Sequence, residues 1–157
     1  MSGRWAVGVG VWVLAVCLRA GAAQDPADTP MRSTTTGVYT AAQADAGQEI
    51  FAATCIGGCH NIADHKGIAF KQRWEGHPVW ELFHTIHEKM PKDDAGSLSD
   101  EDAIGLVAYL LKLNGLPTGK DPLPTDETTL RKIKIDLPPG GAPGESLTGT
   151  REEKDRW

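Results

Sequence analysis

The chain has 157 residues, of which 40% are hydrophobic, 24% are charged and 6% are aromatic. This length favours a single domain, and so few aromatic residues argue against a large core built from protein side chains alone. The formal net charge is −5. It becomes −7 if Arg4 and Arg19 are removed with a signal peptide, described next, because the chain then has 14 basic and 21 acidic residues. Such an acidic balance disfavours nucleic-acid binding.

The chain begins with a predicted signal peptide, residues 1–23. A short basic start is followed by an apolar run over residues 6–18 and then by four small residues. This pattern is typical of a secretory signal cleaved near Ala22 or Ala23, and the apolar run is too short to span a hydrocarbon core of ~30 Å. We therefore expect export to the periplasm, with no stable membrane span after cleavage. An uncleaved anchor and an acylated Cys17 are the alternatives.

Composition divides the rest of the chain into three parts. Residues 24–36 are polar and contain two prolines, which predicts a leader that lies on the surface or is disordered. Residues 37–136 carry the apolar patterns of a folded domain. Residues 137–157 show no core-forming pattern and are expected to be a disordered tail.

The first helix of the domain is predicted over residues 41–54. Thr40 and Gln43 have the spacing of a capping box, and the segment that follows is rich in alanine and other helix-forming residues. Residues 61–76 show no sustained period, so we expect a loop there.

Two further helices are expected after this loop. Pro78 suits a first helical position, and the apolar stripe behind it must end by Met90, because a residue before proline disfavours helical backbone. Ser99 suits the N-cap of the next helix, whose first turn is acidic. Residues 114–115, Asn-Gly, are a typical helix stop.

Little regular structure is expected beyond Pro117. Residues 125–130 are compatible with one more helical turn, and Ile133 and Ile135 with an extended segment against the domain. The predicted fold class is therefore all-α, with three main helices and irregular extensions at both ends.

The segment richest in chemistry is Cys55-Ile56-Gly57-Gly58-Cys59-His60. Two thiols on one short turn can add to the two vinyl groups of haem, and a histidine directly after the second cysteine is positioned to bind the iron. The usual attachment motif has two residues between the cysteines, whereas this chain has three. Gly57 and Gly58 give the backbone the freedom to absorb the extra residue.

Met90 is the predicted second iron ligand, because it precedes a proline at the start of a polar loop downstream of the motif. Ligation by histidine and methionine raises the reduction potential, as an electron-transfer haem requires. A second strong ligand also closes the iron to substrates, which favours electron transfer over catalysis. A core methionine at a helix end is the alternative for Met90. Rival ligands are the other four histidines, His65, His77, His84 and His87, of which the last is nearest to Met90 in the sequence.

These residues together resemble the class I cytochromes c over roughly residues 38–135. Gly47, Phe51 and Cys55 are spaced four apart, as in the helix of that family that leads into the haem motif. By this resemblance, Tyr109 would pack across Phe51 from the family's C-terminal helix, and Gly47 would let the two helices cross closely.

Two other segments add to the resemblance. The pair Met90-Pro91 resembles the family's distal ligand. Residues 97–117 are similar to small cytochromes that serve periplasmic dehydrogenases, including quinoprotein ones.

The resemblance implies a cytochrome c fold around one covalently attached haem c. Cys55 and Cys59 would anchor the ring, His60 would be the proximal iron ligand, and Met90 would be the distal one. Such a protein is an electron carrier and makes or breaks no bond in a substrate. Its donor would be a periplasmic dehydrogenase, and its acceptor a terminal oxidase or another cytochrome.

The chain departs from the family pattern after the haem histidine. The family usually has a proline there, whose carbonyl accepts the other N–H of that histidine and so fixes its ring. This chain has no proline between His60 and Pro78. The sequence does not identify a replacement for that carbonyl.

Alternatives from other classes stay open at this point. The domain could be a fixed subunit of a larger redox complex, or a gas-binding sensor haem with Met90 unligated. In a haem-free domain, Cys55 and Cys59 could form a disulfide, or bind zinc together with His60 and His65.

Two further sets of residues have more than one interpretation. Trp74 is expected to be a core residue or a donor to a haem propionate. Five basic residues are either a docking rim for an acidic partner or an ordinary solvated face: Lys66, Lys71, Arg73, Lys89 and Lys92.

Overall fold

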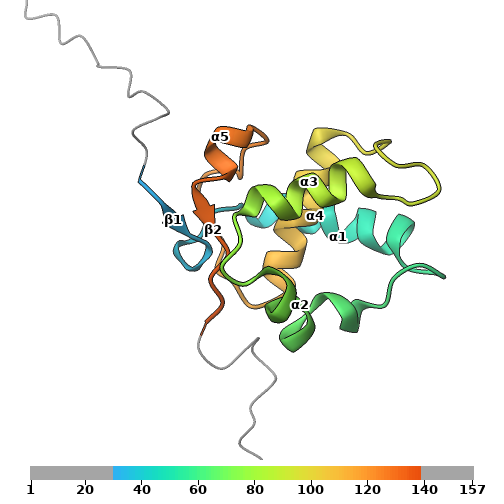
Figure 1. Ribbon diagram of the computed structural model, residues 1–157, viewed down its shortest axis with the longest axis horizontal. Coiled ribbons are helices and arrows are strands. Elements are labelled where there is room, and N and C mark those ends of the chain that lie inside the picture. The colour runs from blue at the N-terminus through green and yellow to red at the C-terminus, as the bar shows by residue number, and fades with distance from the viewer. Residues whose placement is uncertain (1–29, 139–157) are drawn as a thin grey trace, which may run out of the picture.

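A computed structural model describes residues 30–138 of the chain (Figure 1). Its elements in chain order are β1 (Arg32–Ser33), η2 (Thr34–Thr36), α1 (Ala41–Ile50), η3 (Phe51–Cys55), η4 (Ile62–His65), α2 (Gly67–Trp74), α3 (Val79–Lys89), α4 (Asp100–Leu113), α5 (Glu127–Leu130) and β2 (Ile133–Lys134). The predicted all-α class is confirmed, and α1, α3 and α4 are the three longest helices. Across residues 30–138, no helix combines the length and the apolar character needed to span a membrane. The predicted signal peptide, and all but the first two residues of the predicted tail, lie outside the described residues.

Helix α1 begins at the predicted capping box. The Thr40 side chain accepts a hydrogen bond from the Gln43 N–H at 3.3 Å, and the Gln43 side chain accepts one from the Thr40 N–H at 3.2 Å. After Ile50 the helix widens into the π-helical turn η3, where the Ile56 N–H donates to the Phe51 carbonyl at 3.2 Å. The helix therefore leads directly into the predicted cysteine motif.

Helix α4 is the central element of the core. Ser99 caps it as predicted, accepting from the Asp102 N–H at 3.1 Å, and three acidic residues lie in its first turn, where they complement the helix dipole. Every residue from Ala103 to Leu111 is buried. A helix buried on all sides needs neighbours around it, and α1 and α3 pack against this one.

The crossing of α1 and α4 is close because two glycines meet there. A β-carbon built on Gly47 would lie 1.9 Å from the carbonyl oxygen of Gly105, a distance no side chain could tolerate. The aromatic rings of Phe51 and Tyr109 pack across the same crossing with centroids 5.3 Å apart. Both features are those expected from the sequence.

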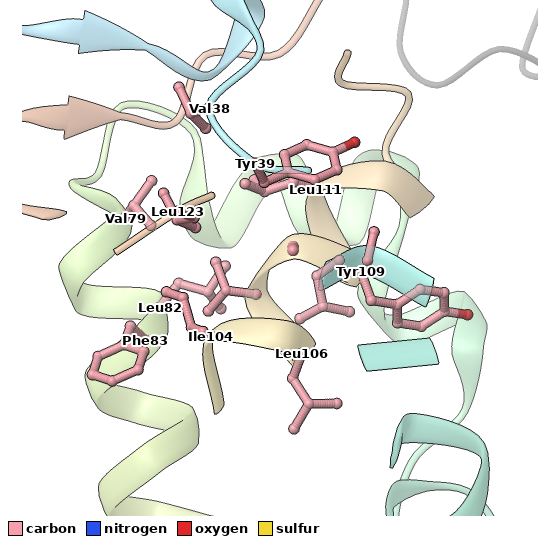
Figure 2. Packing of buried hydrophobic residues seen from close by; sticks show 14 of the residues in the cluster. Val38, Tyr39, Val79, Leu82, Phe83, Ile104, Leu106, Tyr109, Leu111 and Leu123 are labelled. Carbon is pink, nitrogen blue, oxygen red and sulfur yellow. The ribbon is translucent and has the colours of Figure 1, made fainter. Parts of the chain in front are cut away.

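Helix α3 covers another side of α4. Figure 2 shows Leu82 and Phe83 of α3 beside Ile104 of α4, and all three side chains are buried. Pro78 is the N-cap of α3 and not its first helical residue, so the helix begins one residue later than predicted. Met90 is the C-cap, where the helix was expected to end.

The expectation of a loop over residues 61–76 is wrong, because this stretch contains η4 and α2. Helix α2 has eight residues, begins after Lys66 without a side-chain capping bond, and buries only Gly67 and Phe70. One large buried residue gives no repeated apolar spacing, so the sequence lacks the signal by which helices are detected.

The two ends of the described chain meet in a small parallel pairing. Arg32 lies opposite Ile133 and Ser33 opposite Lys134, and Figure 1 shows the strands side by side at one end of the molecule. The next residue, Thr34, is buried; its hydroxyl donates to the Asp136 carbonyl at 2.9 Å and accepts from the Asp136 N–H at 3.0 Å.

This pairing bears on the predicted division of the chain. The last five residues of the predicted leader, 32–36, form β1 and η2 and so are part of the folded unit. The expected extended segment at Ile133 and Ile135 is confirmed, and both side chains are buried.

Candidate haem site

A cavity of about 570 Å³ lies among η3, α2, α3, α4 and the loop after α3. All four predicted site residues line it, namely Cys55, Cys59, His60 and Met90. Its apolar lining includes Phe51, Leu82, Ile86, Leu98, Leu106 and Leu110. The volume is within the range of cofactor sites, roughly 300–1,000 Å³. Two thiols, an imidazole and a thioether around one apolar cavity fit the donor set that a covalently attached haem requires.

The cysteine motif forms a compact turn at the end of η3. The His60 N–H donates to the Cys55 carbonyl at 3.1 Å, which closes the turn. Gly57 and Gly58 have φ values of 108° and 141°, a region that other residues rarely adopt. A β-carbon at either position would meet no atom within 4 Å. The glycines are therefore required by backbone conformation and not by lack of space.

The two thiols differ in their surroundings. Cys55 is half-buried and Cys59 is exposed, and neither is in a disulfide. Burial, and secondarily the neighbouring Cys59, raises the pKa of the Cys55 thiol. Cys55 is therefore held in its protonated form near neutral pH.

The imidazole of His60 is half-buried at the cavity wall. Its Nδ1 lies 3.1 Å from Nε2 of His65, which leaves its Nε2 free for a metal. Burial is the main cause that lowers the pKa of His65; the proximity of His60 and Arg73 adds to it, while Asp64 opposes it. His65 is thus a neutral imidazole near neutral pH.

Met90 reaches the cavity from the C-terminal end of α3. Its N–H donates to the Ile86 carbonyl at 3.2 Å, so the backbone is anchored to the last turn of the helix. The side chain is half-buried, and Pro91 lines the cavity next to it. The structure therefore brings Met90 to the same cavity as His60.

His87, the predicted runner-up ligand, does not line this cavity. Its Nδ1 lies 2.8 Å from Glu88 and its Nε2 lies 3.0 Å from Asp100. Its ring is also stacked on Phe83, with centroids 5.5 Å apart. Both ring nitrogens of His87 thus face carboxylates.

Two other rival histidines also lie outside the cavity lining. His77 is exposed and pairs with Glu81 at 2.7 Å. His84 is stacked on Trp80, with ring centroids 5.5 Å apart. The remaining rival, His65, does line the cavity, but on the side of His60.

The polar part of the lining includes two of the five basic residues that the sequence grouped as a possible rim, Arg73 and Lys92. The Arg73 guanidinium lies 5.2 Å from the centre of the Trp74 ring, which also lines the cavity. Lys71 instead pairs with Glu75 on α2 at 3.4 Å. Thr85 and Ser97 also line the cavity and carry no signal in the sequence that would have identified them.

The zinc alternative would require at least three metal-binding side chains around one point. Within residues 30–138, no group of three or more His, Cys, Asp or Glu side chains is arranged to hold a metal ion.

Comparison with known families adds to this geometry. Residues 42–110, less than half of the chain, match the family model described as "Cytochrome C oxidase, cbb3-type, subunit III". The matched segment runs from α1 into α4 and includes the cysteine motif and Met90. No curated protein and no solved structure gives a significant match. This match supports a cytochrome c domain over residues 42–110, an electron carrier or complex subunit whose cofactor is covalently bound haem c.

Proposed function

We propose that the chain is an exported monohaem electron-transfer protein with histidine and methionine as iron ligands. Cys55 and Cys59 hold the two edges of the ring as thioethers, His60 is the proximal ligand, and Met90 is the distal ligand. The observation that carries the proposal is that one apolar cavity is lined by all four side chains, which come from two separate parts of the chain.

The arrangement suits electron transfer better than catalysis. A bound haem would supply a one-electron iron couple, and ligation by both His60 and Met90 would leave no position for a substrate. His60 follows η3 and Met90 follows α3, so each ligand is held by its own helix end. Apolar side chains form much of the cavity wall, and methionine ligation favours the ferrous state.

The side at which a partner would approach is the side where the cavity lining is exposed. Cys59 is exposed, as are the lining residues Lys92, Asp93, Asp94 and Ser97 of the loop after α3. Electrons would enter and leave across this exposed side, from a periplasmic dehydrogenase and to an oxidase or another cytochrome.

The experiment combines covalent attachment with ligation. Wild-type protein from the native host is expected to stain for haem on a denaturing gel, and its mass should exceed that of the mature polypeptide by one haem. The double variant Cys55→Ala/Cys59→Ala should lose both signals. Oxidised wild-type protein should show the near-infrared absorption band of methionine–iron ligation. A mature mass without haem contradicts the proposal.

A second candidate function is supported by the description of the matching family, which is that of an oxidase subunit. In that case the domain is a fixed subunit of a larger redox complex. Size-exclusion chromatography of a mild native extract separates the two candidates. Elution at the mass of the single chain supports the free carrier, and co-elution with a large oxidase or dehydrogenase supports the subunit.

A further inference from the structure

The ring of His60 has two nitrogens, and only one of them can bind a metal. When Nε2 binds, Nδ1 carries a proton that is usually donated to a carboxylate, a carbonyl or water; this bond fixes the ring and raises its basicity. No proline carbonyl is available in the stretch that follows His60. The side chain of His65 lies there instead, with its Nε2 3.1 Å from Nδ1 of His60.

The roles of the two nitrogens follow from the chemistry. A neutral imidazole has one N–H donor and one bare acceptor nitrogen. If His60 binds iron through Nε2, its Nδ1 is the donor, so Nε2 of His65 must be the bare acceptor. The N–H and the lone pair each lie in the plane of their ring, so the bond joins the two ring edges at the 3.1 Å contact, with the ring centroids 4.8 Å apart and the planes inclined at 67°.

The His65 ring is held in this orientation by its neighbours. Its other side meets Phe51 edge to face, with centroids 5.5 Å apart and planes at 85°. Phe51 is itself buried against Tyr109 of α4. The His65 ring therefore lies between the helix crossing and His60, where it has little freedom to turn.

The backbone of His65 is fixed by a second buried group, the amide of Asn114. This side chain is only 1% exposed. Its Nδ2 donates to the carbonyls of His65 at 2.9 Å and Leu110 at 2.8 Å, and its Oδ1 accepts from the Gly67 N–H at 2.9 Å. One amide at the end of α4 thus binds the chain on both sides of Lys66, so His65 is tied to the core by its main chain as well as by its ring.

We propose that His65 is the positioning residue of the haem ligand His60, accepting the Nδ1–H of His60 at its own Nε2, with Asn114 holding His65 in place. The inference rests on the proposed function, since it assumes that His60 binds iron. An accepting nitrogen makes the His60 ring a stronger electron donor to the metal. A stronger donor stabilises the ferric state, so the acceptor lowers the reduction potential relative to a chain without it.

The variants His65→Leu and His65→Gln test this role. Leucine fills the space and cannot accept a hydrogen bond, whereas glutamine can bring its Oε1 close to the position of the imidazole Nε2. We expect the midpoint potential to rise in His65→Leu and to return most of the way to wild type in His65→Gln. His77→Leu is the matched control, because His77 is exposed and does not line the cavity; its potential should equal that of wild type.

A direct measurement on the wild-type protein tests the proposal even if His65→Leu fails to fold or to attach haem. In the ¹⁵N-labelled ferrous protein, an N–H···N hydrogen bond gives a scalar coupling between the two ring nitrogens. We expect this coupling between Nδ1 of His60 and Nε2 of His65, and slow exchange of the His60 ring proton with solvent.

The outcomes distinguish a failure of the proposed role of His65 from a failure of the proposed haem function. Wild-type protein without covalent haem overturns both. Haem-loaded protein with methionine ligation, but without the nitrogen–nitrogen coupling, overturns the role of His65 alone. The same holds if His65→Leu carries haem and has the potential of wild type. A shift in His65→Leu that glutamine reverses, together with the coupling, supports the proposal.

Discussion

Met90 illustrates how one side chain can decide between two kinds of haem protein. It stands between Lys89 and Pro91, its backbone is anchored to the last turn of α3, and its side chain lines the cavity. A haem bound by His60 alone would leave an open iron position and could bind gases. With the thioether in place, that position is filled.

The replacement Met90→Leu tests this choice. We expect the near-infrared methionine–iron band to disappear, the midpoint potential to fall, and carbon monoxide to bind the ferrous protein rapidly, because the sixth position is then open. His87→Leu is the control and should keep the band. Rapid carbon monoxide binding to the unmodified protein would instead support the gas-sensor alternative.

Tyr39 provides the clearest pH dependence outside the site. Its hydroxyl donates to the Leu116 carbonyl at 2.6 Å, and its side chain is fully buried. Burial raises the pKa of Tyr39 to about 12, from an ordinary value of 10.0. The unfolded chain therefore releases this proton at lower pH than the folded chain.

The sign of the effect follows from that difference. The stabilisation from protonated Tyr39 is complete below pH 10 and is lost as the pH rises to about 12. Tyr39→Phe should cost about 1 kcal/mol at pH 7 through the lost hydrogen bond and should flatten the decline between pH 10 and 12. Urea unfolding across this range measures both effects. Tyr109→Phe retains Tyr39 and should keep the steep decline; an equal decline in Tyr39→Phe would contradict the assignment.

At the scale of elements, two glycines meet where α1 and α4 cross, and they differ in the space available for a side chain. A β-carbon on Gly47 would lie 1.9 Å from a backbone carbonyl of α4. A β-carbon on Gly105 would have its nearest neighbour at 3.4 Å, an ordinary contact. The two residues face each other, yet only one has to be glycine.

This asymmetry gives a paired prediction. Gly47→Ala should lower the unfolding free energy by about 3 kcal/mol or more, because the helices must separate to relieve the overlap. Gly105→Ala should change it by less than about 1 kcal/mol, because alanine is the better helix former and the new methyl group fits. Urea denaturation of the two variants makes the comparison; equal losses would show that the crossing is looser than described.

The elements that the sequence predicted well are those with a chemical marker at their ends. The capping box at Thr40, Ser99 with its acidic first turn, and the proline after Met90 all lie where helices begin or end. Helix α2 has no such marker, since Lys66 makes no capping bond. Its position depends on the packing of Phe70, which is a property of the folded chain.

The same distinction applies to the site. Cys55, Cys59, His60 and Met90 could be named because their chemistry is specific to residue type and spacing. The contact between His60 and His65 could not, since it depends on how η4 folds against Asn114 at the end of α4. The sequence indicates Asn114 only as a helix stop, because its amide bonds to residues 65 and 67 exist only in the folded chain.

At the scale of the whole molecule, the segment after α5 returns to the N-terminal end and completes the core. Ile135 is fully buried, and its backbone bonds the loop before α3: its N–H donates to the His77 carbonyl at 2.9 Å, and its carbonyl accepts from the Gly76 N–H at 2.7 Å. This segment lies outside the part that matches the cytochrome family model. It is nevertheless part of the same folded unit.

Ile135→Ala should therefore lower the unfolding free energy by about 2–5 kcal/mol, the usual cost of truncating a large buried side chain. The neighbouring replacement Lys134→Ala is the control, because Lys134 is exposed and makes a surface ion pair with Asp136 at 3.0 Å; its cost should stay below about 1 kcal/mol. Thermal unfolding of the two variants compares these losses of stability. Similar small losses would mean that the domain is stable without this segment.

The pairing of β1 with β2 has a consequence for how the chain is made. Synthesis proceeds from the N-terminus, so Arg32 emerges about a hundred residues before Ile133, its partner in the pairing. Until then the first strand has no neighbour, and the hydroxyl of Thr34 lacks the Asp136 main chain. A prematurely terminated chain can carry the whole cysteine motif and Met90 and still leave this end unpaired. The parallel pairing and the bonds of Thr34 therefore form only in chains that extend as far as Asp136.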